Sequence, residues 1–384
     1  MANRAGSTGI DAALYRREGP WCTAFVDASL GTTAAREAAD GLPEKAAQLL
    51  ASQRADEVDI AAMRAALLPA RGWASPAARF VAVNKGEVVL DEVLPGVEAG
   101  APRVDCGPFP NLVPLARNRG GQFAYVVAEV GRDGGEVRLR HSAAPGVTDV
   151  RRVASNPDEA HHARKVPDQY GEPQNQSATE EIWKRNADGI AKQIDDVVRD
   201  SGARLVVLSG DVKARELVLS QLGEASRAIA TTVDQHTRTG GADQNHFSAE
   251  IEAKVAEAMA NDIRDLSEKV ANRLGSGRGG LALGLSEVVT ALQQAQADTV
   301  LVAQYQDDAT LRALTAEPWL DTEDSPDHAE LVAGSWPAPE VLLRAVALTD
   351  ATIRYVPDGV LPHGVGVAAL LRWPNGETSE RAAS

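Results

Sequence analysis

A polar stretch at residues 154–177 concentrates side chains that could bind RNA. Its basic or protonatable groups are His161, His162, Arg164 and Lys165, and Arg151 and Arg152 precede it. Amides suited to bases or sugar hydroxyls follow at Gln169, Gln174, Asn175 and Gln176, and the ring of Tyr170 could stack on a base. For each residue, the alternative of an ordinary solvated surface loop stays open. The stretch is therefore the candidate binding site.

Other chemical patterns in the sequence are weaker. His161 and His162 are adjacent, and neighbouring side chains rarely converge on one metal ion. The run GSGRGG at residues 275–280 fits a phosphate-binding G-x-G-x-x-G pattern, but it follows a predicted helix and not a strand, which favours a linker. The sequence holds no Walker-type loop, no nucleophile elbow and no zinc spacing. We therefore expect neither a cofactor nor a metal.

Length, charge and cysteine content bound the class of protein. A chain of 384 residues is too long for one ordinary core, which predicts two or three domains. The formal net charge of -15 argues against non-specific coating of nucleic acid, because phosphate binding normally needs a basic face. Two cysteines, Cys22 and Cys106, make neither a disulfide framework nor a zinc site alone. With no leader and no apolar run of roughly 18 residues, we expect a cytoplasmic protein that enters no membrane.

Apolar periodicity predicts a first α/β domain at residues 1–118. Its long Ala-rich helical stretch is interrupted by Gly41, Leu42 and Pro43, and its Gly- and Pro-rich end is predicted to be a loop that leads to the domain boundary. The predicted elements are a buried strand at 21–27, the helical stretch 34–68, a hairpin of strands 79–83 and 87–94, and the loop 95–118.

A middle domain is predicted at residues 119–278, because strands there alternate with helices as in layered α/β folds. The polar loop 154–177 leads into a long helix, and Thr179, Glu180 and Glu181 place an oxygen cap and negative charge at its start. The predicted elements are a hairpin of strands 123–130 and 136–141, helix 179–201, strand 205–209, helix 212–222, an apolar run 228–233 and helix 248–274.

A third α/β domain is predicted at residues 279–384. The predicted elements are helix 285–294, strand 299–304, an acidic insertion at 317–339, helix 340–347 and closing strands 351–356 and 365–373. The expected fold class is α/β, or mixed α+β, with three consecutive α/β domains.

Several stretches resemble the eukaryotic and archaeal class-one release factors and Pelota. LGLSEVVTAL at 283–292 with ADTVLV at 297–302 resembles the start of that family's C-terminal domain, and GVGVAALLRW at 364–373 resembles its terminal strand. FAYVVAEV at 123–130 is similar to the first strand of the middle domain in bacterial members. HHARKV before WKRN, in an Ala-rich chain, resembles the actinobacterial group related to the hibernation factor Balon. The order of the three predicted domains also agrees with the family.

In this family, a Gly-Gly-Gln tripeptide at the tip of the middle-domain loop positions the water that cleaves peptidyl-tRNA. Here Gly120, Gly121 and Gln122 immediately precede the first strand of the middle domain, and the loop 154–177 holds no such tripeptide. That position favours a flexible joint at the domain boundary. The resemblance thus implies a protein that is not an enzyme. A peptidyl-tRNA hydrolase that uses Gln122 or a loop glutamine stays the alternative.

The resemblance also implies that the first domain faces the decoding centre of the ribosome. Candidate contacts are Ser29, Thr32, Thr33 and Arg36, although helix capping by Thr32 or Thr33 is an alternative, and the family's Asn-Ile-Lys-Ser codon-reading tetrapeptide is absent. The implied function is a monomeric ribosome hibernation factor that fills the vacant A site and contacts 16S and 23S rRNA. Elongation factor Tu is a candidate delivery partner. An interaction protein that has left the ribosome is a further alternative.

Overall fold

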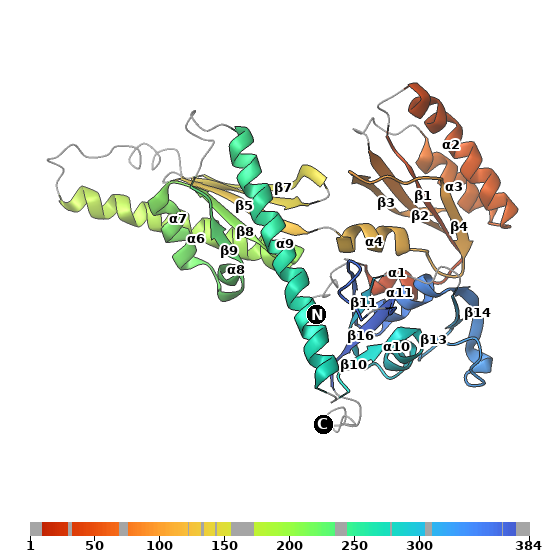
Figure 1. Ribbon diagram of the computed structural model, residues 1–384. Coiled ribbons are helices and arrows are strands. Elements are labelled where there is room, and N and C mark those ends of the chain that lie inside the picture. The colour runs from red at the N-terminus through yellow and green to blue at the C-terminus, as the bar shows by residue number, and fades with distance from the viewer. Residues whose placement is uncertain are drawn as a thin grey trace. The chain divides into compact units, whose positions relative to one another are not determined.

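The computed structural model describes residues 10–29, 33–68, 76–121, 123–131, 134–142, 144–154, 173–234, 244–276, 279–303, 309–362 and 364–373 (Figure 1). The chain forms two compact units, each described here by itself: a terminal unit of residues 1–121 with 263–384, and a middle unit of residues 122–262. Mixed α/β structure is present in both units, which confirms the predicted fold class. Among the described helices, none combines the length and apolar character that a membrane span requires.

The N-terminal part of the terminal unit is an antiparallel sheet in the order β3-β2-β1-β4. Cys22, Ala24 and Val26 on one face of β1 pack against Leu50 and Met63 of the covering helices. The strand and hairpin predicted at 21–27 and 79–94 are confirmed. The elements are α1 (Ala12–Arg16), β1 (Trp21–Asp27), α2 (Thr33–Ser52), α3 (Glu57–Leu67), β2 (Ala77–Asn84), β3 (Glu87–Pro95), β4 (Arg103–Gly107) and α4 (Val113–Gly121).

Two predictions for this part are wrong. Helix α2 continues through Pro43 and ends at Ser52, because burial of the turn that follows the proline offsets the lost backbone hydrogen bond. The predicted loop 95–118 contains strand β4 and helix α4. Only Val104 of β4 is buried, as befits an edge strand, so the pattern of apolar residues gave little sign of it.

The edge strand β4 is closed on its outer side by a side chain. The Nε2 of Gln53 donates to the Val104 carbonyl oxygen at 2.8 Å, and the Cys106 N–H donates to Gln53 Oε1 at 2.8 Å. One amide side chain therefore satisfies the donor and the acceptor that a further strand would use.

The C-terminal part of the terminal unit has a sheet in the order β10-β16-β11-β15 and a smaller sheet in the order β13-β12-β14. The helices and strands predicted here are confirmed within a few residues, and the predicted insertion folds into the smaller sheet. The elements are β10 (Leu281–Leu283), α10 (Gly284–Gln293), β11 (Ala297–Val302), β12 (Thr310–Leu314), β13 (Leu320–Asp321), η1 (Ala329–Leu331), β14 (Val332–Pro337), α11 (Ala338–Leu348), β15 (Thr352–Tyr355) and β16 (Val367–Leu371).

The middle unit is a five-stranded sheet in the order β7-β6-β5-β8-β9 (Figure 1). Val126 and Ala128 of β5 face α6 and α7, whereas Tyr125 and Val127 face α9, so helices cover both faces. The elements are β5 (Ala124–Gly131), β6 (Gly134–His141), β7 (Ala144–Ala154), α6 (Pro173–Ser201), β8 (Val206–Gly210), α7 (Val212–Gln221), α8 (Glu224–Ala228), β9 (Ala230–Thr232) and α9 (Gln244–Gly275). From Ile263 onward, α9 belongs to the terminal unit.

A shared amide joins two carboxyl groups in the terminal unit. Asn111 Nδ2 donates to Asp105 Oδ2 at 3.1 Å and to Glu340 Oε1 at 3.2 Å, and so links the segment after β4 to helix α11. Burial raises the pKa of Glu340 to about 7, and the charge of Asp105 adds to the rise. Burial also raises the pKa of Asp105. The site therefore favours a protonated Glu340 below neutral pH.

We predict a pH-dependent stability difference for Glu340→Gln. The pKa of Glu340 in the folded state, about 7, lies above its ordinary value of 4.5, so folding favours the protonated form. The wild type therefore loses stability relative to the variant as pH rises from 4.5 to above 7, by about 1–2 kcal/mol once partial solvent screening is allowed for. Urea denaturation of the full chain at pH 4.5, 6 and 8 measures this difference.

The matched control is Glu330→Gln, which neutralises an exposed carboxylate in the same unit. Its difference from the wild type should stay near zero at all three pH values. A Glu340→Gln difference that does not change with pH would contradict the prediction.

Candidate functional site

The candidate site is the edge of the middle sheet at which its parallel strands end. Strands β5, β8 and β9 are parallel, and β7 shares their direction because both β7 and β5 pair antiparallel with β6. Their last residues, Gly131, Gly210, Thr232 and Ala154, therefore lie along one edge, which we call the carboxyl edge. In open α/β sheets this edge is where ligands commonly bind.

The predicted binding stretch departs from the carboxyl edge after Ala154. The residues that lie outside the described part of the chain are His161, His162, Arg164, Lys165, Gln169 and Tyr170. Arg151 and Arg152 belong to β7, which the sequence did not predict. The RNA-binding role of all these residues stays a prediction.

The predicted start of the long helix is wrong. Helix α6 begins at Pro173, so Gln174, Asn175 and Gln176 lie in its first turn and not in a loop. Proline suits the first helical position, because that position needs no N–H donor and its φ is already helical. The capping role expected of Thr179 is thereby excluded, since Thr179 lies inside the helix.

A buried ion pair lies just inside the carboxyl edge. Glu129 of β5 lies opposite Glu136 of β6 and Ser209 of β8 in the strand register, and its side chain is only 3% exposed. Arg138 Nη1 donates to Glu129 Oε1 at 2.8 Å, and Arg138 Nε donates to Glu136 Oε1 at 2.9 Å. The hydrogen bond to Glu136 is the largest cause that raises the pKa of Arg138. A buried carboxylate needs such pairing, because desolvation of an unpaired charge is very costly.

A second buried arginine holds the end of β9. Arg215 of helix α7 is 5% exposed. Its Nη1 donates to the Val233 carbonyl oxygen at 2.5 Å, and its Nη2 donates to Asp234 Oδ1 at 2.8 Å. Asp211 caps α7 by accepting from the Ala214 N–H at 3.1 Å. Sequence analysis missed this group and the Glu129 pair, although a glutamate within the apolar run AYVVAEVG was a visible signal.

The carboxyl edge therefore serves as a charged but internally paired frame. Glu129, Arg138 and Arg215 each bind another part of the same sheet or its connections. Among the described residues, no cluster of three His, Cys, Asp or Glu side chains could hold a metal ion. These contacts link β5 to β6 and hold the end of β9, after which residues 235–243 follow in the sequence.

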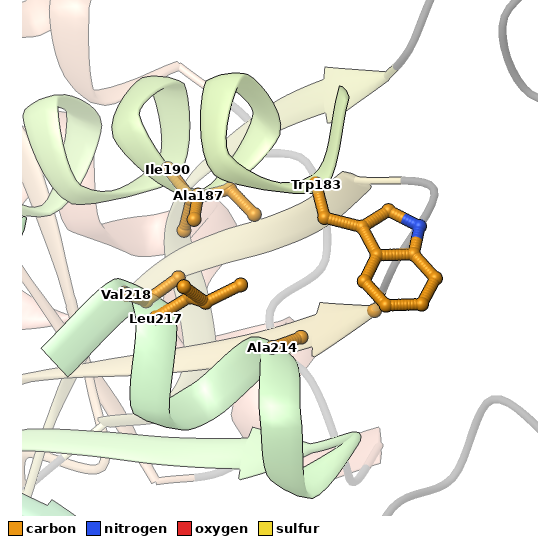
Figure 2. A pocket seen from close by; sticks show the side chains of 7 residues that line it. Trp183, Ala187, Ile190, Ala214, Leu217 and Val218 are labelled. Atoms are coloured by element: carbon orange, nitrogen blue, oxygen red, sulfur yellow. The ribbon is translucent and has the colours of Figure 1, made fainter. Parts of the chain in front are cut away.

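A small cavity lies on the α6 face of this edge (Figure 2). Its volume of about 10 Å³ holds at most one water molecule, so it is a packing gap and no ligand pocket. Trp183, Ala187 and Ile190 reach it from α6, and Ala214, Leu217 and Val218 reach it from α7.

The Gly-Gly-Gln tripeptide precedes β5 in the sequence. Gly120 and Gly121 end helix α4, which corrects the predicted flexible joint, and Gln122 lies outside the described residues. The next residue, Phe123, donates its N–H to Ser142 Oγ at 3.0 Å, beside the start of β5. The eight residues of β5 separate this end from the carboxyl edge by ~26 Å, at about 3.3 Å per residue.

Among the decoding-centre candidates, Ser29 has structural partners. The Ala77 N–H donates to Ser29 Oγ at 3.0 Å, and the Ser29 N–H donates to Asp27 Oδ1 at 2.9 Å. Ser29 thus ties the end of β1 to the start of β2. Thr32 lies outside the described residues, whereas Thr33 is the first residue of α2 and Arg36 lies in its first turn.

Comparison with known proteins finds a family model that matches part of the chain. Residues 124–276 match the model of bacterial archaeo-eukaryotic release factor family 2. The uncharacterized protein Rv2629 of Mycobacterium tuberculosis is 24% identical, over 94% of this chain and 95% of its own. The crystal structure of the archaeal termination factor aRF1 aligns with 95% of this chain and 99% of its own, at 13% identity and a TM-score of 0.27. Saccharomyces cerevisiae Dom34, a translation termination-like factor, aligns with 78% and 80%, at 11% identity and a TM-score of 0.40.

We predict that Gly210→Ala destabilises the middle unit strongly. Gly210 ends β8 at a φ of +111°, and an added Cβ would lie 2.0 Å from the Val130 carbonyl oxygen of the neighbouring strand. Because that atom is backbone, β5 and β8 must separate, at a cost of about 2–4 kcal/mol.

Gly202→Ala is the matched control, since its φ is +65° but nothing lies within 4 Å. It should cost about 1 kcal/mol. Equal losses for the two variants in urea denaturation would contradict the prediction.

Proposed function

Because the chain is release-factor-like over its middle domain, we propose that it binds the ribosome and fills a vacant A site without hydrolysing peptidyl-tRNA. The observation that carries this proposal is the family match of residues 124–276, which includes the whole carboxyl edge. Such a protein would act as a ribosome hibernation factor.

The position of the tripeptide supports binding without hydrolysis. A catalytic glutamine in this family belongs on the connection between a strand and the long helix of the middle domain. Here that connection runs from Ala154 to Pro173. Gln122 instead lies between α4 and β5 in the sequence. A flexible tip that presents Gln122 would first require the end of α4 to unwind.

The distribution of charge supports a local RNA contact. The net charge of -15 disfavours binding through the general surface, and the buried arginines of the carboxyl edge are occupied by internal partners. The basic residues of the stretch after Ala154, which include Arg164 and Lys165, remain the best candidates for contact with 23S rRNA. The first domain would then contact 16S rRNA at the decoding centre.

Ribosome binding also implies an oligomeric state, a delivery partner and a location for the protein. A monomer fits one A site, and elongation factor Tu is the proposed delivery factor. Ribosome binding of this kind places the protein in the cytoplasm. Relationship to the Balon branch is part of the proposal and rests on the run HHARKV before WKRN.

We predict that a variant with His161, His162, Arg164 and Lys165 all replaced by alanine pellets less with vacant ribosomes. Removal of two full positive charges and two imidazoles should weaken binding at least about tenfold at low salt and flatten its salt dependence. Ribosome pelleting of the full chain over a salt series, quantified by densitometry, measures both effects.

The matched control is the double variant Lys192→Ala with Lys213→Ala. These exposed lysines of α6 and α7 carry the same two formal charges within the middle unit. The control should pellet like the wild type. If both variants bind alike, the stretch after Ala154 is not the contact.

We predict no peptide release by the wild-type chain from ribosomes that carry peptidyl-tRNA. The Gln122→Ala variant should give the same background rate, because Gln122 precedes β5 in the sequence, whereas the connection that would reach the peptidyl-transferase centre leads from β7 to α6. A release assay with an active release factor as positive control measures this. Turnover by the wild type that is abolished in Gln122→Ala would overturn the non-hydrolytic part of the proposal and leave ribosome binding intact.

A further inference from the structure

The two cysteines, 84 positions apart in the sequence, meet across a pair of strands. Cys22 of β1 lies directly opposite Cys106 of β4 in the antiparallel register. Their Sγ atoms are 3.4 Å apart, and both are free thiols. The fold, and no local sequence motif, brings them together.

The peptide groups of β4 identify the kind of strand pairing at this point. The Cys106 N–H and the Val104 carbonyl both bond to the side chain of Gln53, on the side of β4 that faces away from β1. Cys22 and Cys106 therefore form a non-hydrogen-bonded pair, in which opposing Cα atoms are about 4.5 Å apart. That distance falls within the roughly 4.4–6.8 Å range of disulfides, so a bond can form without a shift of the strands.

The two thiols have different environments. Cys22 is fully buried and donates its S–H to Cys106 Sγ, whereas Cys106 is half-buried and can be reached from solvent. This hydrogen bond lowers the pKa of Cys106, although burial and the carboxylates of Asp59 and Asp56 oppose the effect. The same bond raises the pKa of Cys22, and burial raises it further. Cys106 is thus the more nucleophilic of the two.

We propose that Cys22 and Cys106 form a peroxide-reactive dithiol that closes reversibly to an intramolecular disulfide. The Cys106 thiolate attacks one oxygen of hydrogen peroxide, the O–O bond breaks, and the other oxygen leaves as hydroxide, which takes up a proton and becomes water. Cys106 is then a sulfenic acid. Cys22 Sγ attacks Cys106 Sγ, the S–O bond breaks, and the hydroxyl leaves as a second water with the Cys22 proton. With hydrogen peroxide, two thiols lose two electrons and one peroxide becomes two waters.

Closure of this bond would tie the edge strand β4 covalently to the central strand β1. Asp105 lies in strand β4, and Asn111 lies in the segment after it. The side chain of Asn111 donates to both Asp105 and Glu340 of helix α11. Oxidation would therefore restrain the part of the N-terminal sheet that contacts the C-terminal part of the same unit. The inference is independent of ribosome binding.

The test uses the reduced full chain treated with equimolar hydrogen peroxide. We expect an intact mass lower by two hydrogens, a peptide map that links Cys22 to Cys106, and no cysteine available to N-ethylmaleimide until dithiothreitol is added. The disulfide should also raise the urea midpoint of the terminal unit, because it closes a long loop in the unfolded chain. Two alkylatable cysteines after peroxide, or a disulfide between chains, would overturn the proposal.

Variants that keep only one cysteine test which thiol reacts first with peroxide. In Cys22→Ala, Cys106 should be trapped by dimedone as a sulfenic acid, and its alkylation should shift to higher pH because the S–H donor is lost. In Cys106→Ala, Cys22 should stay reduced. An unchanged pH profile in Cys22→Ala, or ready oxidation of Cys22 in Cys106→Ala, would overturn the assignment. If Cys22→Ala does not fold, the peptide map of the wild type still decides whether the bond forms.

Discussion

The burial of strand β5 on both faces constrains the rest of the middle unit. Val126 and Val127 are both inaccessible to solvent although they point to opposite sides, so a helix layer must cover each face. Parallel pairing of β5 with β8 then requires a crossover, and the strands that run in this direction all end at one edge. The long polar connections of the unit are thereby placed together at the carboxyl edge.

The same burial explains the chemistry of that edge. A carboxylate at Glu129, on a strand with no solvated face, is tolerable only with a cation beside it, and the next strand supplies Arg138. Arg215 has a different role, since it holds the end of β9 by donating to the Val233 carbonyl oxygen and to the exposed Asp234. The charges nearest the sheet therefore stabilise the fold, and recognition of a partner is left to the segments that the sheet supports.

Where a local pattern decided the structure, the sequence was sufficient to predict it. Strand β1 is a buried run with a polar end, and β2 and β3 flank an Asn-Lys-Gly turn, so these elements were predicted closely. The roles of two prolines were predicted wrongly. Pro43 was expected to interrupt a helix but lies inside α2, where the following turn is buried. Pro173 was expected in a loop but is the first residue of α6. The sequence of β4 gave almost no sign of a strand, because only Val104 is buried. Pairing with β1, and not the composition of β4, makes it a strand.

The site was less predictable than the fold. The pairing of Glu129 with Arg138 depends on the hairpin register, and the meeting of Cys22 with Cys106 depends on a strand pairing across most of the first domain. A shift of one residue would send either side chain to the other face. The predicted stretch at 154–177 begins where β7 ends, its residues 173–177 belong to α6 and not to a loop, and the residues between lie outside the described part of the chain.

The amide of Gln53 has a consequence for the behaviour of the protein at high concentration. An exposed edge strand can recruit a strand from another molecule, which leads to domain exchange or fibrils. Because Gln53 occupies both peptide groups that an incoming strand would need at Val104 and Cys106, self-association through this side of the N-terminal sheet is blocked. At high protein concentration, the chain would gain colloidal stability from this single side chain.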